Sequence, residues 1–233
     1  MRKNADYEEY YAKSVLEFCF PEKFSELRVA DRPDLVGKSP DIGIEVTRLA
    51  GDMVKATGLW NRLNEGKCRN EEGTIGEIDK CGASVISCCD NTKHFGALVK
   101  KDASEYNEES APADLVRNIC NTFLSKCDRA KEYKKYSQNA LFISVRGTVL
   151  RTWASAIGEA IHDVYRKQKF NKEFVFNVVY LLSGGESVLL EFNVETGRLI
   201  CCREISAQEQ HEISHRAMEQ FRKDLRMISS TTR

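Results

Sequence analysis

Two carboxylates near the start of the chain have the surroundings expected of a cation site. Asp34 follows Pro33, which cannot donate to a sheet ladder and therefore marks the exit of an expected strand. Glu45 stands in the middle of a second expected strand, where Ile44 and Val46 point to the opposite face. A carboxylate inside an apolar strand is unfavourable to bury unless it is paired or holds a cation. Carboxylates that converge from neighbouring strands form an oxygen-rich pocket suited to Mg²⁺.

The same residues resemble the motif of a known family. Pro33-Asp34, ten intervening residues and Glu45-Val46-Thr47 on a strand are similar to the motif of the PD-(D/E)xK nuclease superfamily. The resemblance implies that Asp34 and Glu45 bind Mg²⁺ or Mn²⁺ and that the chain hydrolyses phosphodiester bonds in DNA or RNA, with DNA the favoured partner. It also implies a restriction endonuclease-like fold and a place in restriction, repair or a mobile element.

One position departs from the family motif. Thr47 stands where the family has a lysine that assists the attacking water, so the Thr47 carbonyl or hydroxyl would complete the metal shell. Some members of the family supply the lysine from a neighbouring helix. In a helix expected over 112–136, Lys126 falls within about 60° of the centre of the apolar face, where its amine should seek a carboxylate. Lys126 is therefore the first candidate for the missing amine, and Lys131 and Lys134 are the next.

The first helix offers a further candidate carboxylate. Apolar residues at helical spacing predict a helix over 5–19. Glu8 flanks the apolar stripe, whereas Glu9 and Glu17 point farther from it. In many nucleases of the family a glutamate of the first helix reaches the metal, which makes Glu8 the candidate by position. The alternative is an ordinary solvated helix charge.

Two other interpretations of these residues stay open. In the first, residues 27–49 form a plain β-hairpin in which Asp34 caps a turn and Glu45 faces solvent. In the second, the chain has the nuclease fold but has lost catalysis, and it binds nucleic acid or a protein partner. The presence of Thr47 where the family motif has a lysine favours this second interpretation. Lys126 would then be an amphipathic side chain at the edge of the core.

A different metal motif lies near the C-terminus. The segment His211-Glu212-Ile213-Ser214-His215 matches HExxH, which on a helix places two histidines one turn apart and is typical of zinc metallopeptidases. Polar residues precede the motif, and Glu219 on the same helix is the only evident third ligand. We therefore expect the two histidines to be surface residues of a charged helix.

The nine cysteines indicate reduced thiols in the cytoplasm, because no apolar run near Met1 resembles a secretory signal. No segment of the sequence has the length and apolar character of a membrane span. Four residues could together supply zinc ligands, with Cys68 as a fifth, although none has CxxC spacing. They are Cys81, Cys88, Cys89 and His94.

The balance of charge excludes a uniformly basic nucleic-acid-binding protein. The net charge is +0 and the pI is about 6.9, so any surface for nucleic acid must be local. Basic residues cluster at 126–135 and 166–172. These clusters would suit a phosphate backbone, or they are solvated helix ends. The net charge does not predict whether the chain is a monomer or an oligomer.

The remaining periodicity predicts a single α/β domain over 1–233. Gly43 leaves room for another group to approach its strand closely. Residues 67–110 are the least regular, with short strands at 83–88 and 96–99, and are interpreted as an insertion or small lobe. The other expected strands are 25–31, 41–48, 140–145, 173–182, 187–194 and 198–205, and the other helices are 51–66, 150–167 and 207–227. The expected fold is a restriction endonuclease-like mixed central sheet flanked by helices, with a C-terminal antiparallel meander and helix.

Overall fold

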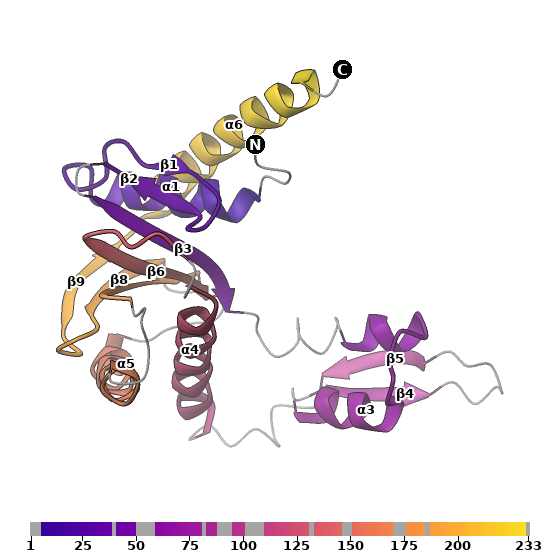
Figure 1. Ribbon diagram of the computed structural model, residues 1–233. Helices are drawn as coiled ribbons and strands as arrows, with labels where there is room; N and C mark the ends of the chain where they lie inside the picture. Colours follow the sequence, from indigo (N-terminus) through magenta and orange to yellow (C-terminus); the bar gives the residue numbers. More distant parts are fainter. Residues whose placement is uncertain are drawn as a thin grey trace. The chain divides into compact units, whose positions relative to one another are not determined.

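The chain divides into two compact units in the computed structural model (Figure 1). The structure describes residues 6–38, 41–49, 59–80, 83–87, 95–100, 110–130, 133–145, 151–169, 176–184 and 187–231. The first unit consists of Met1–Leu49 and Leu115–Arg233, and the second is Ala50–Asp114. The second unit therefore interrupts the first between its third and fourth strands.

A mixed sheet of seven strands forms the centre of the first unit. Its strands, in spatial order, are β1 (Arg28–Val29), β2 (Leu35–Gly37), β3 (Ile42–Leu49), β6 (Gln138–Val145), β7 (Val178–Ser183), β8 (Val188–Asn193) and β9 (Leu199–Glu204). The central strands β3, β6 and β7 run parallel, and the outer pairs are antiparallel. The α/β class, the flanking helices and the meander β7–β8–β9 confirm the prediction from periodicity.

Helices cover both faces of this sheet. One face carries α1 (Tyr7–Cys19) and α6 (Ala207–Thr231), and the other carries α4 (Ser110–Arg129) and α5 (Ala154–Lys169), which follows the short 3-10 turn η3 (Arg151–Trp153). Because side chains alternate along a strand, Ile42, Ile44 and Val46 enter the core beneath α1, while Leu49 joins the core beneath α4. Glu45 therefore belongs to the α4 face.

The expected hairpin over 27–49 contains one more strand than predicted. The short strand β2 lies between β1 and β3 and pairs with both of them. A three-residue strand has no usable periodicity, so the prediction of one strand over 25–31 paired directly with 41–48 was wrong. Asp34 lies immediately before β2, next to the strand that carries Glu45.

The other differences concern the ends of elements. The helix expected over 112–136 ends at Arg129, and Tyr133 and Tyr136 lie beyond it without helical structure. The strand expected from residue 173 begins at Val178 among the described residues. None of the described helices combines the length and apolar character that crossing a membrane requires.

The second unit has its own small core. It contains α3 (Glu71–Lys80) and the antiparallel pair β4 (Ala83–Ser87) and β5 (Phe95–Lys100). Leu59 and Leu63, from a helical turn at 59–64, pack with Ile78 of α3. Since these leucines belong to the core of the second unit, its boundary falls at Ala50 and not at the predicted residue 67. The cysteines at 81, 88 and 89 and the histidine at 94 lie outside the described residues.

The rings of Tyr136 and Pro33 pack closely against Gly43 of β3, the strand that also carries Glu45. A Cβ at this position would lie 2.6 Å from Tyr136 Cδ2 and 2.8 Å from Pro33 Cγ. We expect Gly43→Ala to lower the free energy of unfolding by about 1–3 kcal/mol, because both rings must move. Urea denaturation measures this loss. Gly76→Ala is the control, because a Cβ at Gly76 meets nothing within 4 Å; an equal loss in that variant would contradict the steric explanation.

Candidate functional site

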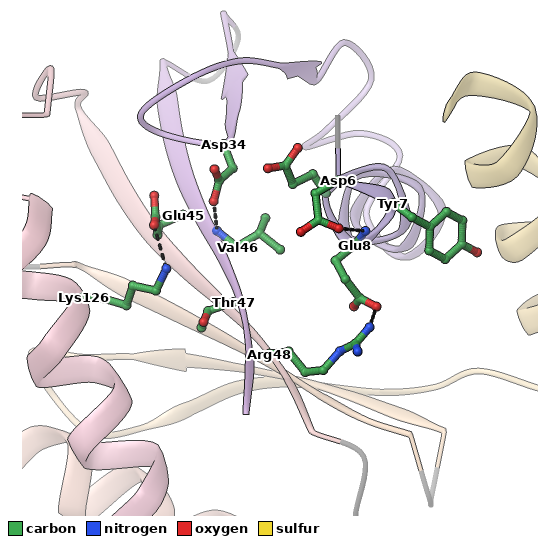
Figure 2. A pocket seen from close by; sticks show the side chains of 10 residues that line it. Asp6, Tyr7, Glu8, Asp34, Glu45, Val46, Thr47, Arg48 and Lys126 are labelled. Atoms are coloured by element: carbon green, nitrogen blue, oxygen red, sulfur yellow. Dashed lines mark hydrogen bonds and ion pairs between the residues drawn. The ribbon is translucent and has the colours of Figure 1, made fainter. Parts of the chain in front are cut away.

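A cleft of about 580 Å³ opens beside the C-terminal half of β3 (Figure 2). Its walls come from the start of α1, from the residue before β2, from β3 and from α4. The five residues that the sequence analysis assigned to a nuclease site line it: Asp34, Glu45, Thr47, Lys126 and Glu8. The described residues that line the cleft all belong to the first unit.

Asp34 and Glu45 are brought together by strand register. Leu35 of β2 pairs with Ile44 of β3, and in an antiparallel pair the preceding residue, Asp34, then lies beside the following one, Glu45. Asp34 is anchored by the backbone of β3, because its Oδ2 accepts a hydrogen bond of 2.8 Å from the Val46 N–H (Figure 2). Two acidic side chains therefore face one cleft, which excludes the interpretation in which Glu45 faces solvent.

Lys126 reaches Glu45 from α4. Its Nζ lies 2.8 Å from Glu45 Oε1, and the two side chains are only 17% and 7% exposed (Figure 2). This contact confirms that the Lys126 amine meets a carboxylate, as helical geometry predicted. The second oxygen, Glu45 Oε2, is buried and accepts no hydrogen bond from any residue that the structure describes. A buried oxygen in this state is unfavourable, and a cation would relieve it.

The pKa of Asp34 is raised from 3.8 to about 7. Burial is the largest cause, followed by the negative charge of Glu45 and, after the Val46 hydrogen bond, that of Glu9. The Val46 N–H and the Lys126 ammonium act in the opposite direction but do not cancel the rise. An added cation would favour the ionised form of Asp34.

This shift predicts a pH dependence of stability. Between pH 4 and pH 7 the folded state binds more protons at Asp34 than the unfolded state does, so the free energy of unfolding should fall as the pH rises. Asparagine cannot ionise. Asp34→Asn should therefore weaken this dependence and stabilise the metal-free protein at pH 8 by about 2 kcal/mol, allowing for the partial exposure of the carboxyl.

Urea denaturation at pH 5 and pH 8 measures the effect. Asp31→Asn is the control, because Asp31 is an exposed carboxylate just before the same turn and should keep the wild-type dependence. An Asp34→Asn protein that is less stable than wild type at pH 8 would contradict the assigned cause.

Two residues beside the carboxylates were missed by sequence reasoning. Glu9 is buried, lines the cleft and raises the pKa of Asp34 by its charge, although helical spacing placed it away from the apolar stripe. Burial, the charge of Glu45 and a hydrogen bond to Glu45 raise the pKa of Tyr133 to about 12. Tyr133 follows the true end of α4, so the longer predicted helix concealed its approach to Glu45.

Of the remaining candidates, Glu8 and Thr47 line the cleft. Glu8 forms an ion pair with Arg48 of β3 (Figure 2), so it has a positively charged partner without a metal ion. Thr47, the residue before Arg48 in β3, is half-buried and also lines the cleft. Lys134 lies over the ring of Tyr136, 4.9 Å from its centre, and Lys131 falls outside the described residues.

Several described basic residues of the two clusters are exposed, whereas Lys126 is largely buried against Glu45. Arg129 and Lys135 represent the first cluster, and Arg166 and Lys167 the second. Residues 131–132 and 170–172 are outside the described residues. The clusters therefore remain candidates for phosphate contacts by exposure and charge.

The HExxH segment lies on an exposed face of α6. His211, Glu212 and His215 are exposed, and His215 Nδ1 is 3.8 Å from Glu219 Oε2. Across the described ranges, no three His, Cys, Asp or Glu side chains are grouped so as to hold a metal ion. At the cleft, Asp34 and Glu45 form a pair and are not part of such a group among the described residues.

We expect His211→Ala with His215→Ala to leave the free energy of unfolding within about 0.5 kcal/mol of wild type, because both side chains are exposed. Metal content after purification should also be unchanged. Urea denaturation and elemental analysis check both statements. Stoichiometric zinc in the wild type that disappears in the double variant would contradict the assignment to a surface helix.

No protein-family model, curated protein or solved structure has a significant similarity to this chain.

Proposed function

We propose that the chain is a Mg²⁺- or Mn²⁺-dependent nuclease with a restriction endonuclease-like core. The observation that carries the proposal is the convergence of Asp34, Glu45 and Lys126 on one cleft. Two carboxylates and an amine are the groups that the resemblance to the PD-(D/E)xK superfamily calls for. The amine comes from α4 and compensates for Thr47.

The donor set fits a hard divalent cation. Mg²⁺ in enzymes that act on phosphates is commonly held by one or two carboxylates and completes its shell with water and substrate oxygens. Asp34 and Glu45 supply the two carboxylates, and Glu45 Oε2 has no partner among the described residues. Two carboxylates are thus compatible with Mg²⁺, which would take its other ligands from water and substrate.

Each of these cleft residues then has a definite role in hydrolysis. When bound, the cation would lower the pKa of a coordinated water and neutralise charge that develops on the phosphate. Asp34, which the Val46 N–H orients, and Glu45 would hold it. Lys126 would orient the attacking water or stabilise charge on the phosphate. Glu9 and Tyr133 lie close enough to influence the two carboxylates through charge and hydrogen bonding.

The proposed substrate is nucleic acid, with DNA favoured over RNA. A chain with zero net charge needs local cationic groups to bind a phosphate backbone. Arg48 at the rim and the exposed Lys135 and Arg129 are such groups in the first unit. Restriction, repair or a mobile element, acting in the cytoplasm, is the proposed setting.

A second candidate function is binding without catalysis. Lys126 already neutralises Glu45 at 2.8 Å, so this carboxylate has a positively charged partner without a metal ion. Together with Thr47 at the lysine position, this contact favours a nuclease fold that binds nucleic acid or protein without cutting it. The two functions differ in one measurable property, which is hydrolysis in the presence of metal.

The deciding experiment incubates purified protein with single- and double-stranded DNA and RNA in Mg²⁺, Mn²⁺ or chelator. Metal-dependent cleavage that chelator abolishes supports the nuclease. Metal binding and nucleic-acid binding without cleavage support the second candidate. The absence of both metal binding and nucleic-acid binding would overturn both proposals.

A further inference from the structure

The lining of the cleft is rich in carboxylates and poor in cations that could meet a phosphate. Lys126 is held by Glu45 at 2.8 Å and is 17% exposed. Arg48 is the other cation among the described residues of the lining. The described carboxylates of the lining outnumber these two cations; they are Asp6, Glu8, Glu9, Asp34 and Glu45. A phosphate that enters the cleft therefore depends on Arg48 for a positive charge from the lining.

Arg48 stands near the end of β3, on the side of the strand that faces α1. Side chains alternate along a strand, so Arg48 shares the face of Val46, whereas Glu45 points toward α4. The described pairing of β2 with β3 reaches only to Ile44. By the same alternation, the Arg48 N–H points to the side of β3 on which the Val46 N–H meets Asp34. The guanidinium and the backbone N–H of this one residue are both donors that phosphate oxygens accept from.

Glu8 of α1 occupies the Arg48 guanidinium in the absence of a ligand. The two side chains form an ion pair and point toward one another across the mouth of the cleft (Figure 2). Asp6 caps the helix, and its Oδ1 accepts a hydrogen bond of 3.0 Å from the Glu8 N–H, which fixes the start of α1 beside β3. Arg48 and Glu8 are 35% and 24% exposed, so water reaches the pair and the contact can exchange. A carboxylate and a phosphate bind the same donors of a guanidinium.

We propose that Arg48 binds a backbone phosphate of the substrate and that Glu8 competes with this phosphate for it. This role rests on the proposed action on nucleic acid and adds a control on binding at the same cleft. Three residues of strand separate Arg48 from Glu45, which is about 10 Å along β3. Arg48 therefore meets a phosphate beside the one that the two carboxylates would address. Glu8 holds Arg48 until that phosphate replaces it.

The test is a double-mutant cycle on the full chain, read by the fluorescence anisotropy of a labelled DNA duplex in chelator, where no metal-dependent hydrolysis occurs. Glu8→Gln should tighten binding about 5-fold, because a partly exposed ion pair no longer has to be broken. Arg48→Gln should weaken binding and reduce the slope of log affinity against log salt by about 0.9, the value of one phosphate contact. In the Arg48→Gln background, Glu8→Gln should change the affinity by less than about 2-fold, because Glu8 acts through Arg48.

A matched control separates this competition from a general effect of charge. Glu212→Gln removes the same charge from an exposed helical glutamate that does not line the cleft, and it should leave the affinity unchanged. Circular dichroism confirms folding of each variant. A Glu8→Gln protein that binds no more tightly than wild type, or an equal gain in the Arg48→Gln background, would overturn the proposal. Metal-dependent cleavage by wild type alongside either result would leave the nuclease proposal standing, whereas DNA binding by none of the variants would overturn both.

Discussion

Replacing Glu45 with glutamine is expected to lower metal-dependent cleavage by at least about 10³-fold. Glutamine keeps the size of the side chain and removes the charge that would hold the cation, and electrostatic stabilisation of this kind is commonly worth about 10²–10³-fold or more in rate. Because Lys126 is partly exposed and can reach water, the folded state should lose only about 1–2 kcal/mol. Single-turnover cleavage and calorimetric titration with Mn²⁺ measure the two effects.

Glu191 provides a matched control for this variant. It is a buried glutamate on β8 of the same sheet, it is held by Lys23 at 2.7 Å, and it does not line the cleft. Glu191→Gln should therefore disturb folding at least as much as Glu45→Gln and leave cleavage unchanged. If Glu45→Gln cleaves as wild type does, the assignment of the site is wrong. If wild type binds Mn²⁺ and cuts nothing, the second candidate function is correct.

Replacing Lys126 with methionine is expected to have the largest effect on stability. Methionine preserves the packing of the side chain and leaves the Glu45 carboxylate buried without its cation. Removal of one partner of a buried ion pair typically lowers stability by about 3–5 kcal/mol, and the partial exposure of Lys126 places the expected loss near about 3 kcal/mol. Urea denaturation in chelator measures it. Millimolar Mg²⁺ should restore part of the loss by supplying another positive charge.

The same variant tests the part that Lys126 plays in hydrolysis. Cleavage should fall by about 10²-fold or more, while affinity for nucleic acid stays close to wild type. Lys223→Ala is the control, because Lys223 is an exposed lysine on α6 that does not line the cleft. Unchanged cleavage in Lys126→Met would remove this residue from the mechanism, and an unchanged free energy of unfolding would show that the ion pair contributes nothing in solution.

Much of the fold and the central part of the site could be predicted from local patterns. Alternation of apolar residues located β3 and assigned Ile44 and Val46 to the face opposite Glu45. Helical spacing placed Lys126 at the edge of the buried face of α4, and a buried amine needs a carboxylate. These inferences held because each depends on a single element and its periodicity.

The residues that were missed depend on contacts between elements. Glu9 is buried because the start of α1 forms a wall of the cleft and brings this carboxylate near Asp34. A stripe of apolar residues indicates one buried side of a helix. It does not indicate that a carboxylate on another side of α1 is buried as well. Tyr133 reaches Glu45 only because α4 ends at Arg129, and the chain carries no glycine or proline there to mark the end.

The position of the second unit also bears on how the chain folds. It lies within the connection between β3 and β6, which pair in parallel although about 90 residues separate Leu49 from Gln138. Closing a flexible loop of that length opposes pairing by about 4 kcal/mol of chain entropy. An inserted unit with its own core, built on Leu59, Leu63 and Ile78, shortens the flexible part of that loop if it folds first. The insertion would then accelerate the pairing that builds the cleft, and weakening its core should slow the folding of the whole chain.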